Sequence, residues 1–487
     1  MPLRIFNVLG REKQDFVPLE AGRVGMYVCG PTVYDQSHIG HAKTYIAFDV
    51  VVRYLRYSGL DVLYVQNLTD VGHLLDSGED RILKKAAQTQ SKPMAIAEQY
   101  ARAYQDAMDK LNVTRPDIQP RASGHIPEQI KMIQTLIEKE NAYEANGSVY
   151  FDVMSDPDYG KLSNRHVEQQ EAGSRETVRG EKHNPEDFAL WKSADPEHIL
   201  RWDSPWGEGF PGWHIECSAM AKKYLGETFD IHGGGVDNVF PHNESEIAQS
   251  ECANDVEFAK YWMLVGSLLV PDSSGNPVKM SKSLKNFVTI SDALQRFRPE
   301  VVRMFMMSAH YSSPITYDVA SMEATERGWE RLYNSVRLVR RAMNGAPAGS
   351  ADGNGILKRA DETKVAFVAA MDDDFSAPQA LAALQDFTRD VNSLLNSGSA
   401  VGLDVLSSVN DLYGTLGGDV LGIIPKTDEA ASSDGAREAA LIEMMITLRG
   451  QARASKNWAE SDRIRAELEK IGVILEDRAD GTIWKTT

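Results

Sequence analysis

The chain has 487 residues, which predicts several domains because single hydrophobic cores rarely grow beyond roughly 250–300 residues. Three cysteines exclude a disulfide framework, and a net charge of -18 argues against a uniformly basic surface for nucleic acid, although not against a local basic face. No apolar run approaches the ~18 residues of a membrane span, and the first residues lack the pattern of a signal peptide. We therefore expect a cytoplasmic protein that does not enter a membrane.

The first part of the chain, residues 1–115, alternates strand and helix patterns. Residues 24–28 form an apolar strand that ends at Cys29, residues 41–59 have the apolar spacing of a helix, and residues 62–67 form a second strand. This order is that of a βαβ unit and predicts a parallel sheet. Ligands of such sheets bind beyond the carboxyl ends of the strands.

Two further segments complete the predicted α/β region. Residues 116–205 are rich in Pro, Gly and charge, with one strand-like stretch at 147–153 that looks isolated, so we predict an inserted subdomain. The α/β pattern resumes in residues 206–265, where a strand at 229–231 is followed by the glycine run 233–235. The predicted fold class is therefore α/β, with a Rossmann-type parallel sheet split by an insertion.

The rest of the chain is predicted to be mainly helical. A loop-containing region, 266–318, leads to a helical bundle, 319–425, and then to a small C-terminal domain, 426–487, with a helix pair and one tail strand. Residues 279–303 carry six Lys/Arg against two Asp/Glu, and residues 326–341 carry five against two. These runs form either a basic path on an acidic body or ordinary solvated faces.

Two short strings more than 230 positions apart carry groups that suit phosphate. His38-Ile-Gly40-His41 follows the first strand and opens a helix, whose N-terminus offers amide donors to an anion. Lys279-Met-Ser-Lys282-Ser lies in a loop and supplies two ammonium groups. Taken singly, the histidines could be metal ligands or unrelated polar residues, and the lysines a solvated loop. Together the strings resemble the paired signatures of class I aminoacyl-tRNA synthetases, which activate a carboxylic acid with ATP and pass it to tRNA.

Four dispersed residues have side chains that are common zinc ligands: Cys29, Cys217, His242 and Glu246. Cys29 lies at a strand end, Cys217 lies near a helix start, and the other two are four residues apart on one predicted helix face. Spacing alone leaves buried structural cysteines as the alternative, and Cys252 is predicted to be a core residue.

Three strings identify a closer resemblance: CGPTVYD from Cys29, GWHIECSAM from Gly212, and FPHNESE from Phe240. They resemble the zinc-binding positions of the cysteinyl-tRNA synthetase family. Family members often have His-His-Glu-Asn-Glu where this chain has His-Asn-Glu-Ser-Glu from His242, but the first His and the last Glu are both present. The resemblance implies one Zn²⁺ held by Cys29, Cys217, His242 and Glu246. It also implies that the metal selects a substrate thiolate over a hydroxyl.

The same resemblance implies roles for further residues and regions. The implied substrates are ATP with its Mg²⁺, L-cysteine and tRNA(Cys), and the enzyme would be a monomer. Residues 266–318 would contact the tRNA stem, and residues 426–487 would contact the anticodon. The implied catalytic residues are His38, His41, Lys279 and Lys282; the implied ATP-binding residues are Gly40, His41, Gly233, Gly235 and Lys282. The implied substrate-pocket residues are Thr69, Trp213, His214 and Asp237, and the tRNA contacts are Arg337 and Trp484.

Two alternative functions stay open at this point. A related ligase activates cysteine identically but transfers it to an amino sugar, and it shares the catalytic core; the segment from about Asp428 to Thr487 favours tRNA instead. A non-catalytic tRNA-binding paralogue is the other alternative, and the intact ATP and metal strings argue against it.

The role of Trp484 also has two interpretations. Its ring could stack on an unpaired anticodon base, or it could equally pack the last strand onto its own domain.

Overall fold

The computed structural model describes residues 2–73, 80–165, 181–195, 198–272, 274–280, 286–349, 355–397, 401–427, 434–478 and 481–486. The chain divides into two compact units, Met1–Ile424 and Pro425–Thr487, which are described separately. Within the described residues, no helix is both long enough and apolar enough to cross a membrane.

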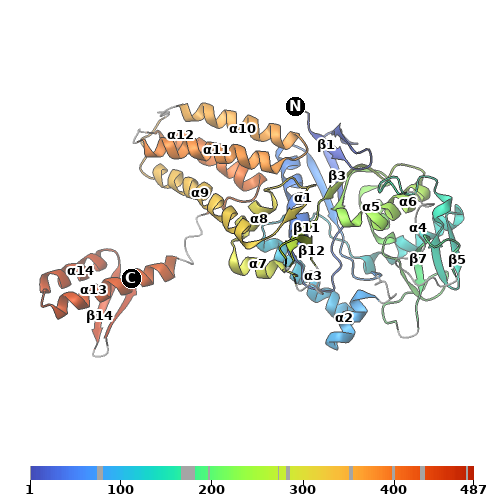
Figure 1. The fold of residues 1–487 in the computed structure, drawn as a ribbon, viewed down its shortest axis with the longest axis horizontal. Coiled ribbons are helices and arrows are strands. Elements are labelled where there is room, and N and C mark those ends of the chain that lie inside the picture. The colour runs from blue at the N-terminus through green and yellow to red at the C-terminus, as the bar shows by residue number, and fades with distance from the viewer. Residues whose placement is uncertain are drawn as a thin grey trace. The chain divides into compact units, whose positions relative to one another are not determined.

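A four-stranded parallel sheet organises the first unit, in the order β10-β9-β3-β4. Figure 1 labels its strand β3 and the helix α1. The crossover from β3 to β4 is the long helix α1, and residues such as Tyr27 and Val65 in these strands are fully buried. Burial of that kind is typical of parallel strands covered on both faces. The predicted Rossmann-type sheet is therefore confirmed. The bounds are β3 (Arg23–Val28), α1 (Ile39–Tyr57), β4 (Asp61–Gln66), β9 (Phe229–Gly235) and β10 (Ala259–Val265).

The insertion contains a second, antiparallel sheet in the order β5-β6-β7-β8. The expectation of one isolated strand at 147–153 was wrong, because β6 pairs with a neighbour on each side. The strand β5 has only four residues, and the apolar strand β7 lies far from β6 along the chain, so the local sequence pattern did not reveal either pairing. The bounds in the insertion are α4 (Ile126–Glu138), β5 (Ala142–Ala145), β6 (Ser148–Phe151), β7 (Phe188–Ser193) and β8 (Gly209–Pro211). The helices α5 (Ile215–Leu225) and α6 (Glu244–Asn254) follow the insertion, before and after β9.

Shorter elements flank the central sheet. A hairpin precedes it, two helices follow β4, and a small mixed sheet with two helices follows β10. The bounds are β1 (Arg4–Asn7), β2 (Glu12–Asp15), α2 (Arg81–Thr89), α3 (Pro93–Lys110), β11 (Leu268–Pro271), β12 (Pro277–Lys279), α7 (Ile290–Arg296), α8 (Pro299–Met306) and β13 (Ile315–Thr316).

The buried guanidinium of Arg303 links the helix α1 to the helical region that follows α8. Arg303 of α8 donates to the Asp49 carboxylate of α1 at 2.6 Å and to the carbonyl oxygen of Leu421 at 2.9 Å. Asp49 and Arg303 have no exposed side-chain surface, so removing one partner would leave an uncompensated charge. The helical region comprises α9 (Val319–Met343), α10 (Ile356–Asp372), α11 (Ala377–Asn396), α12 (Leu403–Leu412) and a π-helical segment (Tyr413–Val420).

The second unit, Pro425–Thr487, consists of two helices and an antiparallel hairpin. The expectation of a single tail strand was wrong, because a second strand begins immediately after the turn at Gly472, which has φ of 81°. Arg449 donates two hydrogen bonds to the Asp477 carboxylate, at 2.7 and 2.8 Å, and so ties the hairpin to a helix. The bounds are α13 (Asp434–Ala454), α14 (Trp458–Lys470), β14 (Val473–Arg478) and β15 (Gly481–Thr486).

Candidate active site

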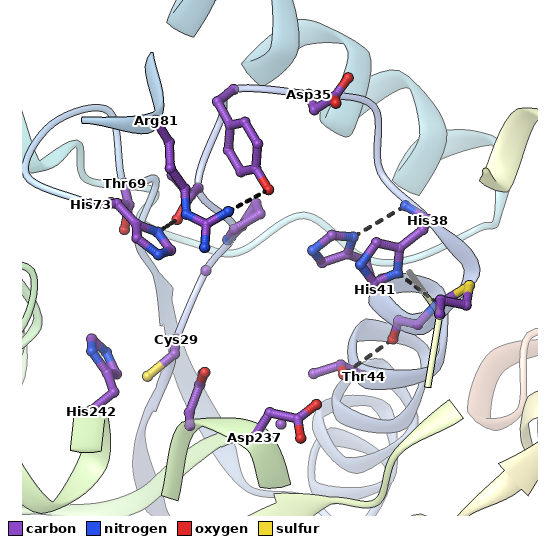
Figure 2. Close-up of a pocket in the computed structure, with 18 of the residues that line it drawn as sticks. Cys29, Asp35, His38, His41, Thr44, Thr69, His73, Arg81, Asp237 and His242 are labelled. Carbon is purple, nitrogen blue, oxygen red and sulfur yellow. Dashed lines mark hydrogen bonds between the residues drawn. The ribbon is translucent and has the colours of Figure 1, made fainter. Parts of the chain in front are cut away.

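A pocket of about 890 Å³ opens at the carboxyl end of the parallel strands (Figure 2). Its lining joins residues that are far apart in the sequence, from the turn after β3 to the segment after β12. This is the position at which parallel α/β sheets bind ligands. The predicted site residues that line it are Cys29, His38, Gly40, His41, Thr69, Trp213, Cys217, Gly235, Asp237, His242 and Lys279.

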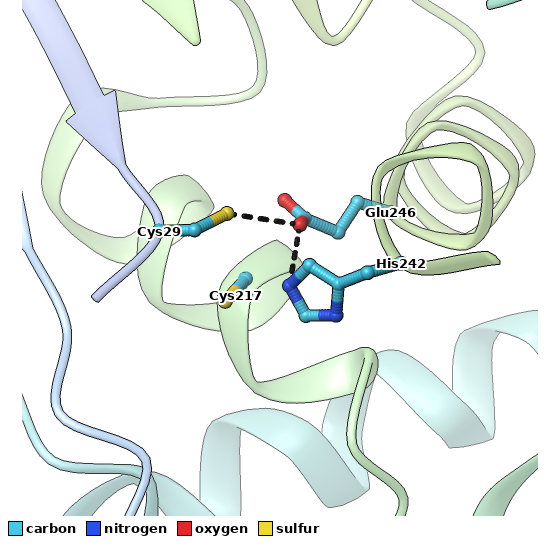
Figure 3. A group of neighbouring side chains, drawn as sticks. All are labelled: Cys29, Cys217, His242 and Glu246. Atoms are coloured by element: carbon cyan, nitrogen blue, oxygen red, sulfur yellow. Dashed lines mark hydrogen bonds and ion pairs between the residues drawn. The ribbon is translucent and has the colours of Figure 1, made fainter. Parts of the chain in front are cut away.

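One end of the pocket is a cluster of potential metal ligands: Cys29, Cys217, His242 and Glu246 (Figure 3). One ligand atom from each residue lies within 4.8 Å of all the others, and all four residues are buried. Cys29 follows β3, Cys217 lies in the first turn of α5, and the other two lie just before and within α6. The His242 Nε2 atom is 2.8 Å from Glu246 Oε1.

Neighbouring side chains orient this cluster. His232 Nε2 lies 2.6 Å from the second carboxylate oxygen of Glu246, and Asn243 Nδ2 donates to the first at 3.2 Å. On the other side, His214 Nδ1 lies 2.9 Å from His242 Nδ1. Such outer contacts fix the direction in which ligand atoms point.

The charge balance of the cluster suits a divalent cation. A hydrogen bond from Cys217 favours the Cys29 thiolate, but burial and the charge of Glu246 outweigh it and raise the pKa of Cys29 to about 11. Burial raises the pKa of the Cys217 thiol well above its usual value. Burial opposes ionisation of Glu246 as well, yet the charges of His232 and His242 hold its pKa well below the usual range. A bound cation would relieve the repulsion among two thiolates and one carboxylate, and two Cys, one His and one Glu are a normal zinc donor set.

The opposite end of the pocket is built by the N-terminus of α1. His38 is the N-cap residue: its Nδ1 atom accepts from the Gly40 amide at 3.1 Å, while His41 Nδ1 accepts from the His38 amide at 3.2 Å. The two rings stack with centroids 3.9 Å apart. Because each Nδ1 accepts, the neutral rings carry their protons on Nε2. Burial and the neighbouring His38 lower the pKa of His41 well below its usual value, so that ring is neutral near pH 7.

Gly40 is required at this cap for steric reasons. A Cβ atom at position 40 would lie 2.8 Å from atoms of the His38 ring and 3.4 Å from the Met280 methyl group. Any larger residue would therefore push the capping imidazole away from the helix. The same contact shows that Met280, from the second string, lies against the first.

The segment after the second string also pairs with the first. The Ile39 amide donates to Val288 O at 3.1 Å, the Ile290 amide donates to Ser37 O at 3.0 Å, and the Phe287 ring lies edge-on to His38 with centroids 5.3 Å apart. Lys279 lines the pocket and forms an ion pair with Asp237. Lys282 lies outside the described residues.

The predicted substrate-pocket residues have different positions. Thr69 and Trp213 line the pocket. The Thr69 hydroxyl donates to the buried Glu216 carboxylate, and the Trp213 ring stacks on His73, with centroids 4.1 Å apart, and lies 4.8 Å from the His242 ring. Asp237 lies near the phosphate end. His214 is buried behind His242 and supports it without lining the pocket.

The two predicted ATP-binding glycines differ. Gly235 lines the pocket, and a Cβ atom there would meet only Thr44 Oγ1 at 3.9 Å. Gly233 is a packing residue, because a Cβ atom there would lie 2.5 Å from the Phe48 ring of α1. It therefore allows the helix to approach the sheet closely.

The predicted tRNA contacts lie outside the pocket lining. Arg337 is exposed on α9, as are Arg327 and Arg331. Trp484 is partly buried, its indole N–H donates to Glu443 at 3.0 Å, and it packs against the small apolar core of the second unit.

Sequence reasoning missed two groups of residues. His232 contacts Glu246, but it appeared only as the start of a glycine run; its place at a strand next to the metal strings was the available signal. Arg81, Lys84 and Lys85 of α2 line the pocket. Their helical spacing, three and four residues apart, was visible in the sequence, but nothing showed which way that face points.

Comparisons with known proteins agree with this geometry. The family described as "tRNA synthetases class I (C) catalytic domain" matches residues 15–327, and the DALR domain matches residues 366–425. A cysteine–tRNA ligase of Deinococcus radiodurans is 49% identical over 99% of this chain and 96% of its own. Those of Chlorobium luteolum and Thermus thermophilus are 47% and 45% identical, over 100% of this chain and at least 99% of theirs.

Solved structures support the fold. A methionyl-tRNA synthetase from Mycobacterium tuberculosis in complex with methionyl-adenylate superposes with a TM-score of 0.58 at 15% identity, covering 83% of this chain and 92% of that one. A leucyl enzyme from Agrobacterium radiobacter K84 gives 0.57 at 12% identity, covering 85% and 87%. The length and identity of the matches show that this chain belongs to the cysteine–tRNA ligase family of class I aminoacyl-tRNA synthetases.

Proposed function

We propose that the protein activates L-cysteine with ATP and transfers it to the terminal adenosine of tRNA(Cys). One observation carries this proposal: a single pocket is lined at one end by Cys29, Cys217 and His242 and at the other by His38 and His41. A thiol-bearing amino acid and a nucleoside triphosphate can therefore meet in one cavity. The full-length match to cysteine–tRNA ligases supports the same conclusion.

In the first step, the cysteine carboxylate attacks the α-phosphorus of ATP, a new carboxyl O–P bond forms, and pyrophosphate leaves. The Nε2–H groups of His38 and His41 and the amides at the start of α1 would donate to phosphate oxygens. Lys279, with Lys282, would balance the charge on the departing pyrophosphate. No side chain forms a covalent intermediate, because orientation and charge stabilisation suffice.

Zinc is the proposed occupant of the Cys29–Cys217–His242–Glu246 cluster. When bound, it would supply a soft Lewis acid that prefers a thiolate to a hydroxyl. The protein's own contribution is orientation, since His232 and Asn243 hold the Glu246 carboxylate in place. Thr69, Trp213 and Asp237 would complete the pocket around the amino acid, with His214 fixing the His242 ring.

In the second step, a hydroxyl of the terminal adenosine attacks the activated carbonyl, an ester forms, and AMP leaves. Arg337 on α9 is proposed to bind a tRNA phosphate, because it is exposed next to other arginines of that helix. Trp484 is proposed to stack on an anticodon base through the part of its ring that is exposed. Mg²⁺ with ATP, a monomeric state and a cytoplasmic location complete the proposal.

The proposed division of labour follows the predicted boundaries. Residues 1–115 and 206–265 would form the two halves of the catalytic domain, and residues 116–205 the insertion, whose sheet also takes in β8 (Gly209–Pro211) beyond residue 205. Residues 266–318 would contact the tRNA stem. The helical bundle, 319–425, would contact the inner face of the tRNA, and residues 426–487 would contact the anticodon.

Two assays test this function. The zinc-loaded protein should catalyse ATP–pyrophosphate exchange that requires cysteine, and it should attach cysteine to a tRNA(Cys) transcript. Exchange without charging, together with conjugation to an amino sugar, would contradict the choice of acceptor. Absence of exchange in the zinc-loaded protein would contradict catalysis itself.

A further inference from the structure

The helix α2 brings a group of cations into the wall of the pocket. Arg81, Lys84 and Lys85, here called the α2 cation cluster, all line it. Among the described residues, the lining contains four Lys or Arg residues, these three and Lys279, against two carboxylates, Asp35 and Asp237, which is a surplus of two cations. On a chain with a net charge of -18, this is a local concentration of positive charge.

The start of α2 is fixed to the loop that follows β4. The Asp80 carboxylate accepts from the amides of Ile82 at 2.7 Å and Gly72 at 3.1 Å. The Arg81 amide donates to His73 O at 3.1 Å. The α2 cation cluster is therefore held against the strand end that supplies Thr69.

Two of the cations are also anchored to the segment after β3. The Arg81 guanidinium donates to the Tyr34 hydroxyl at 3.1 Å, and Lys85 lies 3.3 Å from the Asp35 carboxylate. The Nε atom of Arg81 is buried, and none of the described residues accepts a hydrogen bond from it. A buried donor without an acceptor is costly, so a ligand acceptor at this position would offset that cost.

The position of Arg81 separates it from the expected site of the ATP phosphates. Figure 2 shows Arg81 and His73 on the side of Thr69, with His38 and His41 across the pocket. The histidine end and Lys279 already provide for the triphosphate, and the metal end for the amino acid. The reaction has a third reactant, which is also a polyanion.

We propose that the α2 cation cluster binds the phosphates of the unpaired 3′-terminal nucleotides of tRNA and so positions the terminal adenosine for transfer. This inference rests on the proposed function. An unpaired end exposes its phosphates to side chains, and a guanidinium can bind a phosphate through two hydrogen bonds. Arg81, Lys84 and Lys85 act in the transfer step only.

The test separates transfer from activation. Arg81→Ala and Lys84→Ala are each compared with the native protein in cysteine-dependent ATP–pyrophosphate exchange, which needs no tRNA, and in charging of a tRNA(Cys) transcript. Lys260→Ala is the matched control, because Lys260 is exposed near the amino end of β10, whereas the pocket lies at its carboxyl end. Arg81→Lys tests whether charge without the guanidinium restores part of the effect.

We expect exchange within about 2-fold of native for all variants, and kcat/KM for tRNA reduced roughly 10- to 100-fold for Arg81→Ala, with a smaller loss for Lys84→Ala. The slope of log kcat/KM against log salt should decrease by about 0.7 for each phosphate contact removed. Equal losses in exchange and charging would assign the cluster to ATP or cysteine and overturn the inference. Unchanged charging would show a merely solvated face and overturn it as well. Failure of the native protein to charge tRNA would instead refute the proposed function, and the inference with it.

Discussion

The two ends of the pocket are built in different ways. At the metal end, the four side chains are buried and come from separate elements, and histidine and asparagine neighbours hold them. At the phosphate end, two neighbouring histidines cap one helix, and the lysine that faces them is 68% exposed. The first end is fixed before any ligand arrives, and the second contains a side chain that is still largely in solvent.

This difference matches the demands of the two reactants. Cysteine and serine differ by one atom, so the groups that distinguish them must be placed accurately in a dry site. A triphosphate presents many oxygens, and its recognition needs charge and donors more than a rigid shape. The following predictions test this contrast, from the largest expected effect to the smallest.

Cys217→Ser should separate the two ends most strongly. Loss of one thiolate should weaken metal binding and reduce kcat/KM for cysteine by more than roughly 100-fold, since changes to groups behind the ligands alone cost about 10- to 100-fold. ATP affinity should stay within a few-fold. Metal analysis, and exchange kinetics with each substrate varied in turn, measure both. Equal losses for cysteine and ATP would mean that the cluster is only structural.

Gly40→Ala should damage the phosphate end alone. The added Cβ would lie 2.8 Å from the His38 ring and displace the cap, and a displacement of about 1 Å can reduce a rate roughly 100-fold. Exchange should slow by about that factor with KM for cysteine unchanged. Gly124→Ala is the matched control, because a Cβ atom there meets nothing within 4 Å. A raised KM for cysteine in Gly40→Ala would show that the two ends are not independent.

Lys279→Ala should also slow the reaction without changing cysteine affinity, but by a smaller factor than Gly40→Ala. The ammonium is exposed and paired with Asp237, so its removal should slow adenylate formation by roughly 10-fold. Rapid-quench measurement of the first turnover gives this rate directly. If cysteine affinity falls instead, the side chain does not belong to the phosphate end. Lys282→Ala, outside the described residues, is predicted to behave likewise.

The pH dependence of stability should report the neutral His41. Its pKa in the folded protein is lowered by burial and by His38, so the unfolded chain takes up the proton first as the pH falls below about 6.5. The contribution of the neutral His41 ring to the free energy of unfolding is therefore complete above that pH. It is lost below that pH, by at most about 1.4 kcal/mol per pH unit. Urea unfolding measured from pH 7.5 to pH 5 should show that the free energy of unfolding falls less with decreasing pH in His41→Asn than in the native protein. Parallel curves would contradict a neutral ring.

The sequence predicted the parallel sheet and its ligand edge because apolar strands and a crossover helix have clear periodicities. Cys29 was placed at that edge for this reason. The position of His242 was less accurate, since it lies in a π-helical turn before α6 and not in the helix itself. No pattern could predict that Cys29 and Cys217 approach each other, because that distance depends on how β3 and α5 pack.

Elements with weak patterns were harder to predict. The strands β5 and β8 have four and three residues, and β14 mixes apolar and charged residues, so none of the three shows a clear alternation. The cations of α2 have the same spacing as a solvated helix face. The structure shows that this face lines the pocket: the Gly72 amide of the loop after β4 donates to the Asp80 carboxylate at the start of α2, and Arg81 donates to the Tyr34 hydroxyl.

Discrimination between cysteine and serine tests the central claim most directly. In the zinc-loaded protein, ATP–pyrophosphate exchange should favour cysteine over serine by at least about 10⁴-fold in kcat/KM, because a buried group of the site is left without its partner when the thiolate is missing. A ratio near 100-fold or less is what size and polarity alone provide. That result would contradict the assignment of Cys29, Cys217, His242 and Glu246 as the groups that hold the metal that selects the substrate.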